Sequence, residues 1–376
     1  MPIDTGADNL YPQAEGPNAD DAVLSASQAS SEAYYRAATT TLSAHPMLAD
    51  ADRSLKLLNR HYGLKGSIST LSSEVECTEE VRLADGRRLI LKTSTRAEAS
   101  NSFRFQAETI SGLPGATGFV APEIVRTAVG GVMFEEDGAC GYLQTLIEGI
   151  PLHKVAITPD LLFRTGRSLA RLDLALDGVD ATASHRPVLL HVGCWPRLME
   201  LSRYLTSQHI TDQVRAAMDN YAECVEPQLA NVAWQVTHND PSPYNMLLTD
   251  SGIGFIDFGD GCWGPRIQDL AVAASHMVSD ATAALGGAEY VIAGYHSVIP
   301  LSRVEARVLV GLMRARQSAL LLVNAWRSHL FPAEAEYINK NVPRAERGLS
   351  ILTTLSADDA EAAVLAAMAL PNPSPL

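Results

Sequence analysis

A short polar segment between two strand-like stretches carries the residues with the clearest chemical potential. It reads QVTHNDPSPYNMLLTDSGIGFIDFGDGCWG over residues 235–264. His238, Asp240 and Asn245 follow the first stretch, and Asp257 ends the second. An aspartate can orient a hydroxyl group and accept its proton, while an asparagine amide oxygen and a second aspartate are ligands suited to Mg²⁺. Asp240, Asn245 and Asp257 therefore supply the set of groups that phosphoryl transfer needs.

The order of these residues, His-x-Asp-x4-Asn followed by Asp-Phe-Gly, resembles the signature of aminoglycoside phosphotransferases and their relatives, which are distantly related to protein kinases. The resemblance implies that Asp240 is the catalytic base, that Asn245 and Asp257 bind Mg²⁺, and that His238 shapes the loop. It also implies ATP or GTP as co-substrate. Family members usually carry glycine where this chain has Asn239, so the backbone geometry at this position must accommodate asparagine in place of glycine. The alternative is that these side chains only shape a turn or cap a neighbouring element.

The family fold also places a lysine on the third strand, where it pairs with a carboxylate on the following helix and binds the α- and β-phosphates. Lys92, in the segment LILKTS, lies at the expected place. A lysine among apolar strand residues is unfavourable to bury unless an anion meets it. Glu108 has the better separation and is the expected partner, whereas the family's helix pattern indicates Gln106. The alternative for Lys92 is an edge-strand lysine that points into water.

Two further segments are expected to contact the nucleotide. The loop between the first two strands contains Ser72 and Ser73, whose hydroxyl and amide groups could meet phosphate oxygens. A plain hairpin turn is the alternative for this loop. Gln144 and Leu146 lie at the expected junction of the two lobes and would contact the nucleotide base through backbone groups.

Over residues 60–345 the chain resembles hydroxylysine kinases more closely. The segment TLIEGIPLHKVAITPDLLFRTGRSLARLDLAL is similar to the lobe junction and first large-lobe helix of that group. Asp173 stands in it where many aminoglycoside kinases carry histidine. The segments IDFGDGCWG and VIAGYHSVIPLSRVEARVLVGLMRARQSALLL are similar as well. The segment HVGCWPRL replaces a Trp-Asp-Leu-like patch of the group, so the resemblance does not define substrate contacts from that region.

Residues shortly after Asp257 are candidates for contact with the acceptor. Asp260 could reach a cationic amine of the substrate or lie in a solvated loop. Trp263 could form a wall of the acceptor pocket or pack in the core. Asp269, which opens the helical segment DLAVAASHM, is expected to cap that helix or anchor the loop, because aspartate is favoured at helix N-termini.

The elements that must position these residues follow from the pattern of apolar residues. Strands are expected over 67–71, 76–83, 88–93, 120–127, 131–135 and 140–147, with an Asp-Gly turn between the second and third. Helices are expected over 51–62, 103–113, 159–176, 198–204, 211–229 and most of 267–370, with short strands at 234–237 and 254–258. The pattern predicts an α+β, protein-kinase-like two-lobe fold, with a small antiparallel β-sheet lobe and a larger mainly helical lobe.

We expect three parts along the chain. Residues 1–45 are rich in Ala, Ser, Asp and Thr and are expected to be a mobile leader. A short helix near residues 30–41 that docks on the main body is the alternative. Residues 46–147 form the expected N-terminal nucleotide-binding lobe, and residues 148–376 the C-terminal helical catalytic and substrate-binding lobe.

Composition limits the partners and the compartment. The chain has 376 residues and a formal net charge of −14. An acidic surface repels nucleic acid and anionic membranes and favours cationic ligands, so we expect neither nucleic acid nor membrane as a partner. The 5 cysteines are widely spread and odd in number, which is typical of reduced thiols, and the N-terminus lacks the pattern of a secretory signal. A cytoplasmic monomer or homodimer is expected.

The expected function is therefore a small-molecule kinase that transfers the γ-phosphoryl group of ATP or GTP to a hydroxyl group. The resemblance to hydroxylysine kinases implies a small amino alcohol or hydroxylated amino acid as acceptor, and we expect this acceptor to be cationic. An O-phosphotransferase for an aminoglycoside or another antibiotic is one alternative. A catalytically silent kinase-like protein that only binds ligand is another, although the intact Asp240, Asn245, Asp257 and Lys92 argue against it.

Overall fold

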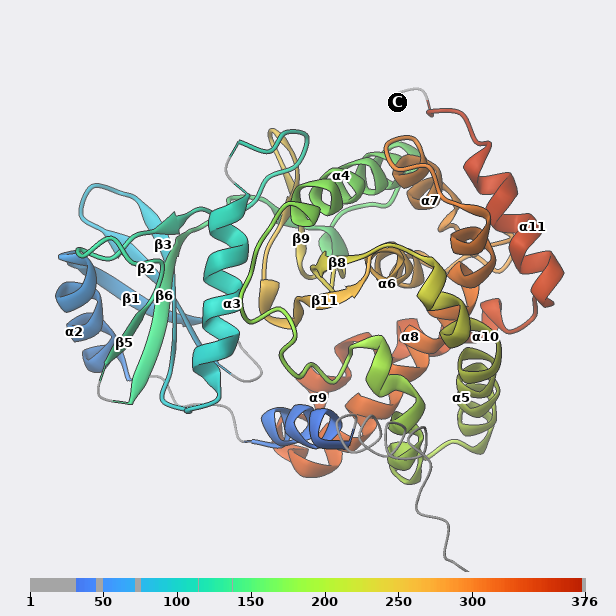
Figure 1. The fold of residues 1–376 in the computed structure, drawn as a ribbon, viewed down its shortest axis with the longest axis horizontal. Coiled ribbons are helices and arrows are strands. Elements are labelled where there is room, and N and C mark those ends of the chain that lie inside the picture. Colours follow the sequence, from blue (N-terminus) through green and yellow to red (C-terminus); the bar gives the residue numbers. More distant parts are fainter. Residues whose placement is uncertain (1–31, 45–49, 72–75, 114, 137, 374–376) are drawn as a thin grey trace, which may run out of the picture.

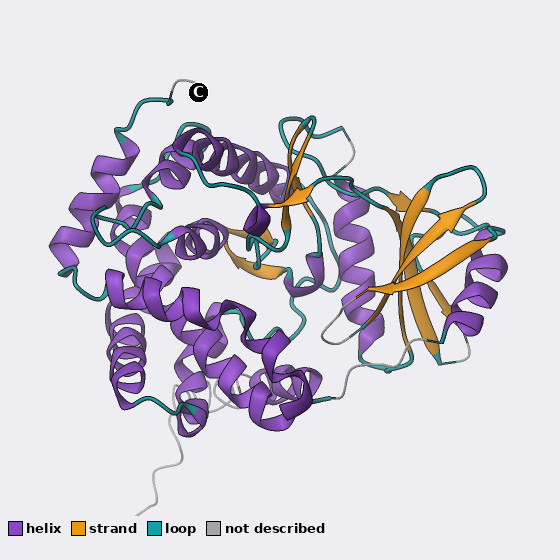
Figure 2. Cartoon of the chain, turned by 180° about the vertical axis from the view of Figure 1, so that it is seen from behind, coloured by secondary structure: helices purple, strands orange, loops and turns teal. Residues whose placement is uncertain are grey.

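The structure, a computed structural model, describes residues 32–44, 50–71, 76–113, 115–136 and 138–373. In these residues, a small lobe built on an antiparallel sheet lies beside a larger and mainly helical lobe (Figure 1). Figure 2 shows the same division from behind, with the short strands of the large lobe near the junction. The expected α+β class with two unequal lobes is confirmed.

The small lobe is a twisted antiparallel sheet with one helix at its outer end and one facing the large lobe. Its strands are β1 (Gly66–Leu71), β2 (Cys77–Leu83), β3 (Arg88–Ser94), β4 (Ile124–Val125), β5 (Phe134–Glu136) and β6 (Ala139–Thr145). They pair in the order β1-β2-β3-β6-β4, and β5 also pairs with β6. Alternate residues of β2 are buried, as expected for a strand with one covered face. The β2–β3 turn contains Gly86, which has a φ of 88° that glycine adopts without strain.

Two helices complete this lobe. Helix α2 (Ala51–Tyr62) starts at Asp50, whose side chain accepts from the Arg53 amide, and ends at Gly63 in the left-handed conformation. Helix α3 (Ala99–Gly112) lies between the sheet and the large lobe (Figure 1). Phe103 of α3 packs edge-to-face on Tyr142 of β6, with ring centroids 5.5 Å apart. Side chains of α3 can therefore reach both the sheet and the interface between the lobes.

Contacts between the lobes include the chain crossing itself and a pair of backbone hydrogen bonds. The chain crosses over residues 146–149, between β6 and β7 (Ile150–Pro151), and β7 pairs with β9 of the large lobe. The second connection is made by Val120, whose amide donates to Ile253 O at 2.9 Å and whose carbonyl accepts from Phe255 N at 2.8 Å. These backbone bonds tie the small lobe to β10 (Gly252–Phe255), the strand that leads into Asp257.

Helices dominate the large lobe, and two small sheets lie within it. Strand β8 (Trp234–Thr237) pairs with β11 (Cys262–Pro265), and β9 (Met246–Thr249) pairs with β7 and β10. The helices are α4 (Pro159–Asp177), α5 (Gln208–Asn220), α6 (Ile267–Met277), α7 (Glu289–His296), α8 (Arg303–Leu330), α9 (Ala335–Ile338), α10 (Val342–Leu352) and α11 (Ala357–Met368). Helix α8 begins with a capping box formed by Ser302 and Glu305.

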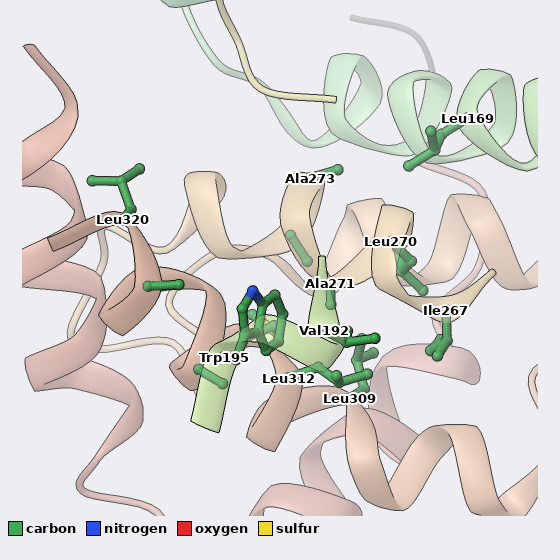
Figure 3. Close-up of a cluster of buried hydrophobic side chains, with 14 of the residues drawn as sticks. Leu169, Val192, Trp195, Ile267, Leu270, Ala271, Ala273, Leu309, Leu312 and Leu320 are labelled. Carbon is green, nitrogen blue, oxygen red and sulfur yellow. The ribbon is translucent and has the colours of Figure 1, made fainter. Parts of the chain in front are cut away.

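The core of the large lobe forms where α4, α6 and α8 meet. Leu169, Leu270 and Leu312 from these helices are fully buried there, in the same apolar cluster as Trp195 (Figure 3). The Trp195 indole donates to Leu190 O at 3.0 Å, so its polar edge is satisfied. Helix α8 is long and apolar enough to cross a membrane, but most of its apolar stretch is buried inside the protein, as in the core helix of a globular domain.

Proline changes several of the expected elements. The expected strand at 120–127 is reduced to β4, because Pro122 cannot donate to a sheet ladder. The expected helix at 198–204 belongs to a 3₁₀ run, Val192–Tyr204, that contains Pro196. The expected helix at 211–229 ends as an α-helix at Asn220 and continues as a π-helical turn and a 3₁₀ turn that begins around Pro227.

The expectation of a mobile leader is wrong for residues 32–43, which form a helix docked on the large lobe. Tyr35 and Ala38 of this helix are buried in the core of that lobe. Tyr34 OH donates to Arg186 O at 2.9 Å and accepts from Val188 N at 3.1 Å. The alternative, a helix that docks on the main body, is the one that these residues adopt. Residues 1–31 and 45 of the expected leader lie outside the described residues.

Candidate active site

Two loops that carry the predicted catalytic residues lie side by side at one end of the β9–β10 hairpin. The pairing of β9 with β10 is antiparallel, and beyond it Ile256 N donates to Asn245 O at 2.9 Å. His238 links the two loops again, because its Nε2 lies 3.1 Å from Ile256 O. The hairpin thus brings Asn245 and Asp257 to one edge, and Asp240 contacts Asn245 within the first loop.

The Asp240 carboxylate is held by two short hydrogen bonds and a longer one of 3.4 Å from Ser242 Oγ. Its Oδ1 accepts from Arg316 Nη2 at 2.9 Å, and its Oδ2 accepts from Asn245 Nδ2 at 2.8 Å. The side chain remains 20% exposed. Burial raises the pKa of Asp240 to about 7, while the charge of Arg316 opposes this increase. An oriented carboxylate with a pKa near neutrality is suited to accept a proton from a hydroxyl group.

Asn245 and Asp257 form a donor set that fits Mg²⁺. The Asn245 amide nitrogen donates to Asp240, which leaves its Oδ1 as the atom available to a cation. The Asp257 side chain is 52% exposed, and the charge of Lys92 lowers the pKa of Asp257, so this carboxylate is ionised. Carboxylate and amide oxygens are the hard ligands that Mg²⁺ prefers. No cluster of three or more His, Cys, Asp or Glu side chains suited to a metal occurs elsewhere in the described part of the chain.

Lys92 lies on β3 with its ammonium group turned to three oxygen atoms. Its Nζ is 2.9 Å from Asp257 Oδ1, 3.1 Å from Gln106 Oε1 and 3.6 Å from Glu76 Oε2. Burial lowers the pKa of Lys92, but the charges around it outweigh burial and place the pKa well above its ordinary value. The alternative of a solvent-facing edge lysine is wrong, because the residue is buried and β3 lies between β2 and β6.

Gln106 is the residue of α3 that faces Lys92. Its Oε1 accepts from Lys92 and from Tyr142 OH, the latter at 2.8 Å. Its Nε2 donates to Glu76 and Ser102, both at 3.1 Å. The amide is therefore satisfied on both sides and holds Lys92 by a hydrogen bond.

The expected pairing of Lys92 with Glu108 is wrong. Glu108 points to the large lobe, where its Oε2 accepts from Thr182 N at 2.9 Å and from Thr182 Oγ1 at 2.8 Å. Side chains that are two residues apart on an α-helix differ by about 200° in direction. Residues 106 and 108 therefore face opposite sides of α3. The carboxylates near Lys92 are instead Asp257 and Glu76.

Asn239 adopts the left-handed conformation that glycine would adopt in the family, with a φ of 64°. Asparagine tolerates this region better than most residues. Its side chain also cross-links the site, since Nδ2 donates to Asp260 O at 3.0 Å and Oδ1 accepts from Gln268. The substitution of asparagine for glycine therefore keeps the turn and adds contacts to it.

Asp269 is the anchor of the catalytic loop, as expected. Its two oxygens accept from His238 N at 2.7 Å and from Asn239 N at 2.6 Å. Burial lowers the pKa of His238 to about 4, so the ring is neutral. A neutral ring can donate from Nε2 to Ile256 O and accept at Nδ1 from Asp240 N, a contact of 3.4 Å.

A second buried carboxyl group, Asp173, supports Asp269. Its Oδ2 accepts from Tyr295 OH at 2.6 Å, and no donor among the described residues faces its Oδ1. Burial, together with the charge of Asp269, raises the pKa of Asp173 well above its ordinary value. Asp173 is therefore protonated and hydrogen-bonds to the Asp269 carboxylate. This chain of contacts runs from α7 through α4 and α6 to the catalytic loop.

The remaining predicted nucleotide-binding residues stand as follows. Ser72 and Ser73 lie outside the described residues. Gln144 is buried on β6, and Leu146 is half-buried at the crossing between the lobes, where its amide donates to Arg88 O at 3.2 Å. Both positions lie at or near the crossing between the lobes, and their contact with a nucleotide base stays a prediction.

The two candidate acceptor residues both lie near the catalytic loop. Asp260 is half-buried, and its charge is one of the causes that raise the pKa of Asp240. Trp263 is 38% exposed on β11 and stacks on His185 with ring centroids 5.5 Å apart. The core-packing alternative for Trp263 is therefore wrong, because much of its ring is open to solvent.

Two residues of the site escaped the sequence analysis. Glu76 approaches Lys92 from the start of β2, and no local motif marks it. Arg316 contacts Asp240 from α8, and the sequence pattern of this helix does mark Arg316. It is a charged residue on the apolar face of a helix, because its neighbours one turn away on either side are buried: Leu312, Met313, Ala319 and Leu320.

Comparison with known proteins agrees with this geometry. The model of the Phosphotransferase enzyme family (APH) matches residues 68–301, more than half of the chain, and the chain belongs to this family. It is a small-molecule kinase that uses a nucleotide as phosphoryl donor and a hydroxyl group as acceptor. The predicted family and kinase-like fold are confirmed.

Relatives point to small acceptors. Hydroxylysine kinase of Danio rerio is 24% identical over 331 residues, which cover 81% of this chain and 92% of that protein. Homoserine kinase of Gluconobacter oxydans is 29% identical over 188 residues, covering 48% of this chain and 58% of that protein. Among solved structures, a microcompartment-associated aminopropanol kinase has a TM-score of 0.61 and 18% identity, covering 83% of this chain and 99% of that one.

The different surroundings of Gln106 and Glu108 lead to a matched prediction. Gln106→Leu removes the hydrogen bond that orients Lys92 and should weaken binding of Mg·ATP about thirtyfold, since hydrogen bonds to charged groups contribute about 2 kcal/mol. Glu108→Gln should leave binding within about twofold, because Glu108 does not contact Lys92. Isothermal titration calorimetry of both variants measures this difference. Equal weakening in the two variants would contradict the placement of Gln106.

The protonated Asp173 predicts a pH dependence of stability. A carboxyl group whose native pKa is raised stabilises the fold below its unfolded pKa of about 4, and this contribution is lost as pH rises through the native pKa. Asp173→Asn keeps the hydrogen bonds without the titration. The wild type should therefore lose stability relative to this variant as pH rises above about 4 towards the raised native pKa of Asp173. Urea unfolding measures the difference, with exposed Asp177→Asn on the same helix as the control. A difference that is independent of pH would show that Asp173 is not protonated.

Proposed function

We propose that this kinase uses Mg²⁺ and ATP or GTP to phosphorylate the hydroxyl group of a small amino alcohol or hydroxylated amino acid. The observation that carries the proposal is the convergence of Asp240, Asn245 and Asp257 on two adjoining loops, with Lys92 in contact with Asp257. The relatives named hydroxylysine kinase and homoserine kinase support the class of acceptor.

In the proposed reaction, the acceptor hydroxyl donates its proton to Asp240 as its oxygen attacks the γ-phosphorus. The new phosphorus–oxygen bond forms while the bond to the β-phosphate breaks, and the nucleoside diphosphate leaves. Mg²⁺ held by Asn245 and Asp257 would supply charge neutralisation at the phosphate oxygens. Lys92 would bind the inner phosphates. The hydrogen bond from Lys92 to Gln106 orients its ammonium group beside Asp257.

An antibiotic acceptor is the second candidate within the same chemistry, because structures of this fold include a spectinomycin phosphotransferase. That similarity, at 13% identity, concerns the fold alone. The curated relatives that cover most of the chain are named for an amino acid acceptor, and for this reason we favour the small acceptor.

A matched pair of variants tests the proposed role of Asp240. Asp240→Asn keeps the shape of the side chain but cannot accept the proton, so turnover should fall about 1000-fold while the Kd for nucleotide stays within about threefold. Asp250→Asn, on the exposed turn between β9 and β10, is the control and should behave as the wild type. Coupled release of nucleoside diphosphate measures turnover with a panel of hydroxylated amines, amino acids and aminoglycosides, each with ATP and with GTP. Unchanged turnover in Asp240→Asn would remove Asp240 from the mechanism.

A further inference from the structure

Arg316 is a buried cation in direct contact with the proposed catalytic base. It lies on α8, the central helix of the large lobe, and its side chain is 3% exposed. Its Nη2 donates to Asp240 Oδ1 at 2.9 Å. An acceptor whose hydroxyl group reaches the Asp240 carboxylate must therefore come within a few ångströms of the guanidinium group, about the length of one further hydrogen bond.

The contact with Asp240 leaves part of the Arg316 side chain uncompensated. Nε and Nη1 are buried and have no hydrogen-bond partner among the described residues. A buried donor without a partner is unfavourable, and more so when it is charged. Asp240 therefore satisfies one of the three guanidinium nitrogens, and the group retains the capacity to bind a second anion. A carboxylate, which can accept two parallel hydrogen bonds, matches this capacity.

Further positive charge gathers on the same side of the catalytic loop. Burial lowers the pKa of His276, and the charges of Arg316 and Arg344 lower it further, so both arginines act on this ring. Burial also lowers the pKa of His153, with additional effects from Arg344 and Lys340 among its neighbours. Arg344 thus contributes positive charge to the surroundings of both histidines.

Lys340 places this charge beside the catalytic loop itself. Its Nζ lies 5.1 Å from the ring centroid of Tyr244, the residue before Asn245, and 3.9 Å from that of Tyr337. The Tyr244 ring in turn stacks on His153 with centroids 4.1 Å apart. Near the loop, Asp257 and Asp260 contribute carboxylates, of which Asp257 is paired with Lys92. Arg316 on α8 and Arg344 on α10 contribute positive charge.

This asymmetry bears on the acceptor. The chain has a net charge of −14, and that balance alone favours a cationic ligand. Locally, however, a purely cationic acceptor would meet the buried charge of Arg316 beside Asp240. An acceptor that carries both an amine and a carboxylate would match both sides, with its amine towards Asp260 and its carboxylate towards the arginines.

We propose that Arg316 binds the carboxylate of the acceptor and thereby selects hydroxylated amino acids over amino alcohols that lack a carboxylate. The inference rests on the proposed function and makes it more specific. It separates two groups among the similar proteins, since hydroxylysine and homoserine carry a carboxylate and aminopropanol does not. Arg344 and Lys340 supply supporting charge, and Arg316 is the residue whose removal should abolish the selection.

The experiment compares acceptors that differ only by the carboxylate. Suitable pairs are homoserine with 3-aminopropan-1-ol, threonine with 1-aminopropan-2-ol, and 5-hydroxylysine with 1,5-diaminopentan-2-ol. The ratio of kcat/KM within a pair is measured for the wild type, for Arg316→Gln, and for Arg307→Gln as a control on the exposed face of the same helix. The wild type and the control should prefer the amino acid about 100-fold or more, and Arg316→Gln should reduce that ratio to about threefold or less.

The ratio of kcat/KM within a pair distinguishes two roles of Arg316, selection of the acceptor carboxylate and mere positioning of Asp240. If Arg316 only positions Asp240, Arg316→Gln lowers kcat/KM equally for both members of a pair, the ratio stays constant, and the proposal is overturned. A wild type without preference for the amino acid overturns it as well. Turnover of neither member would contradict the proposed function instead. Calorimetric titration of the same pairs then still tests the inference, which requires tighter binding of the amino acid by the wild type and equal binding by Arg316→Gln.

Discussion

The ion pair between Lys92 and Asp257 is the contact on which the rest of the site depends. The two residues are 165 positions apart and belong to different lobes, so the pair forms only when the small-lobe sheet and the β9–β10 hairpin are correctly placed. A buried lysine without an anion would be strongly unfavourable, and removal of one partner leaves the other uncompensated. Phosphates and a metal ion can take over these two charges, since Lys92 can turn to the former and Asp257 to the latter. The apoprotein thus holds both charges ready for a nucleotide.

The second constraint is the fixed backbone of the catalytic loop. Asp269 binds two consecutive amides of that loop, and Asp173 and Tyr295 hold Asp269 from the core. These contacts fix the backbone immediately before Asp240. Lone buried carboxylates are costly, but sharing a proton reduces the cost and gives the pair a defined geometry. Asn239 adds cross-links above the same turn, so the loop is held on both of its sides.

Local motifs were sufficient to predict the parts of this site that lie close together in sequence. Asp240, Asn245 and Asp257 were recognisable because residue type and spacing within one hairpin decide their position. The partner of Lys92 could not be recognised in this way. Helix α3 begins at Ala99, four residues before the expected start, and the direction of a side chain changes by about 100° per residue along a helix. Glu76 and Arg316 reach the site only through the tertiary fold, and the prolines at 122, 196 and 227 shortened elements whose apolar pattern alone predicted longer ones.

The central claim is that one magnesium-bound nucleotide joins the small lobe to the hairpin through Lys92 and Asp257. The most direct measurement is calorimetric titration of ATP into the wild type and Asp257→Asn, with and without Mg²⁺. We predict that Mg²⁺ tightens binding to the wild type about 100-fold or more, and that it has almost no effect on Asp257→Asn, because the ionised oxygen ligand is gone. An equal effect of Mg²⁺ on both proteins would contradict the claim.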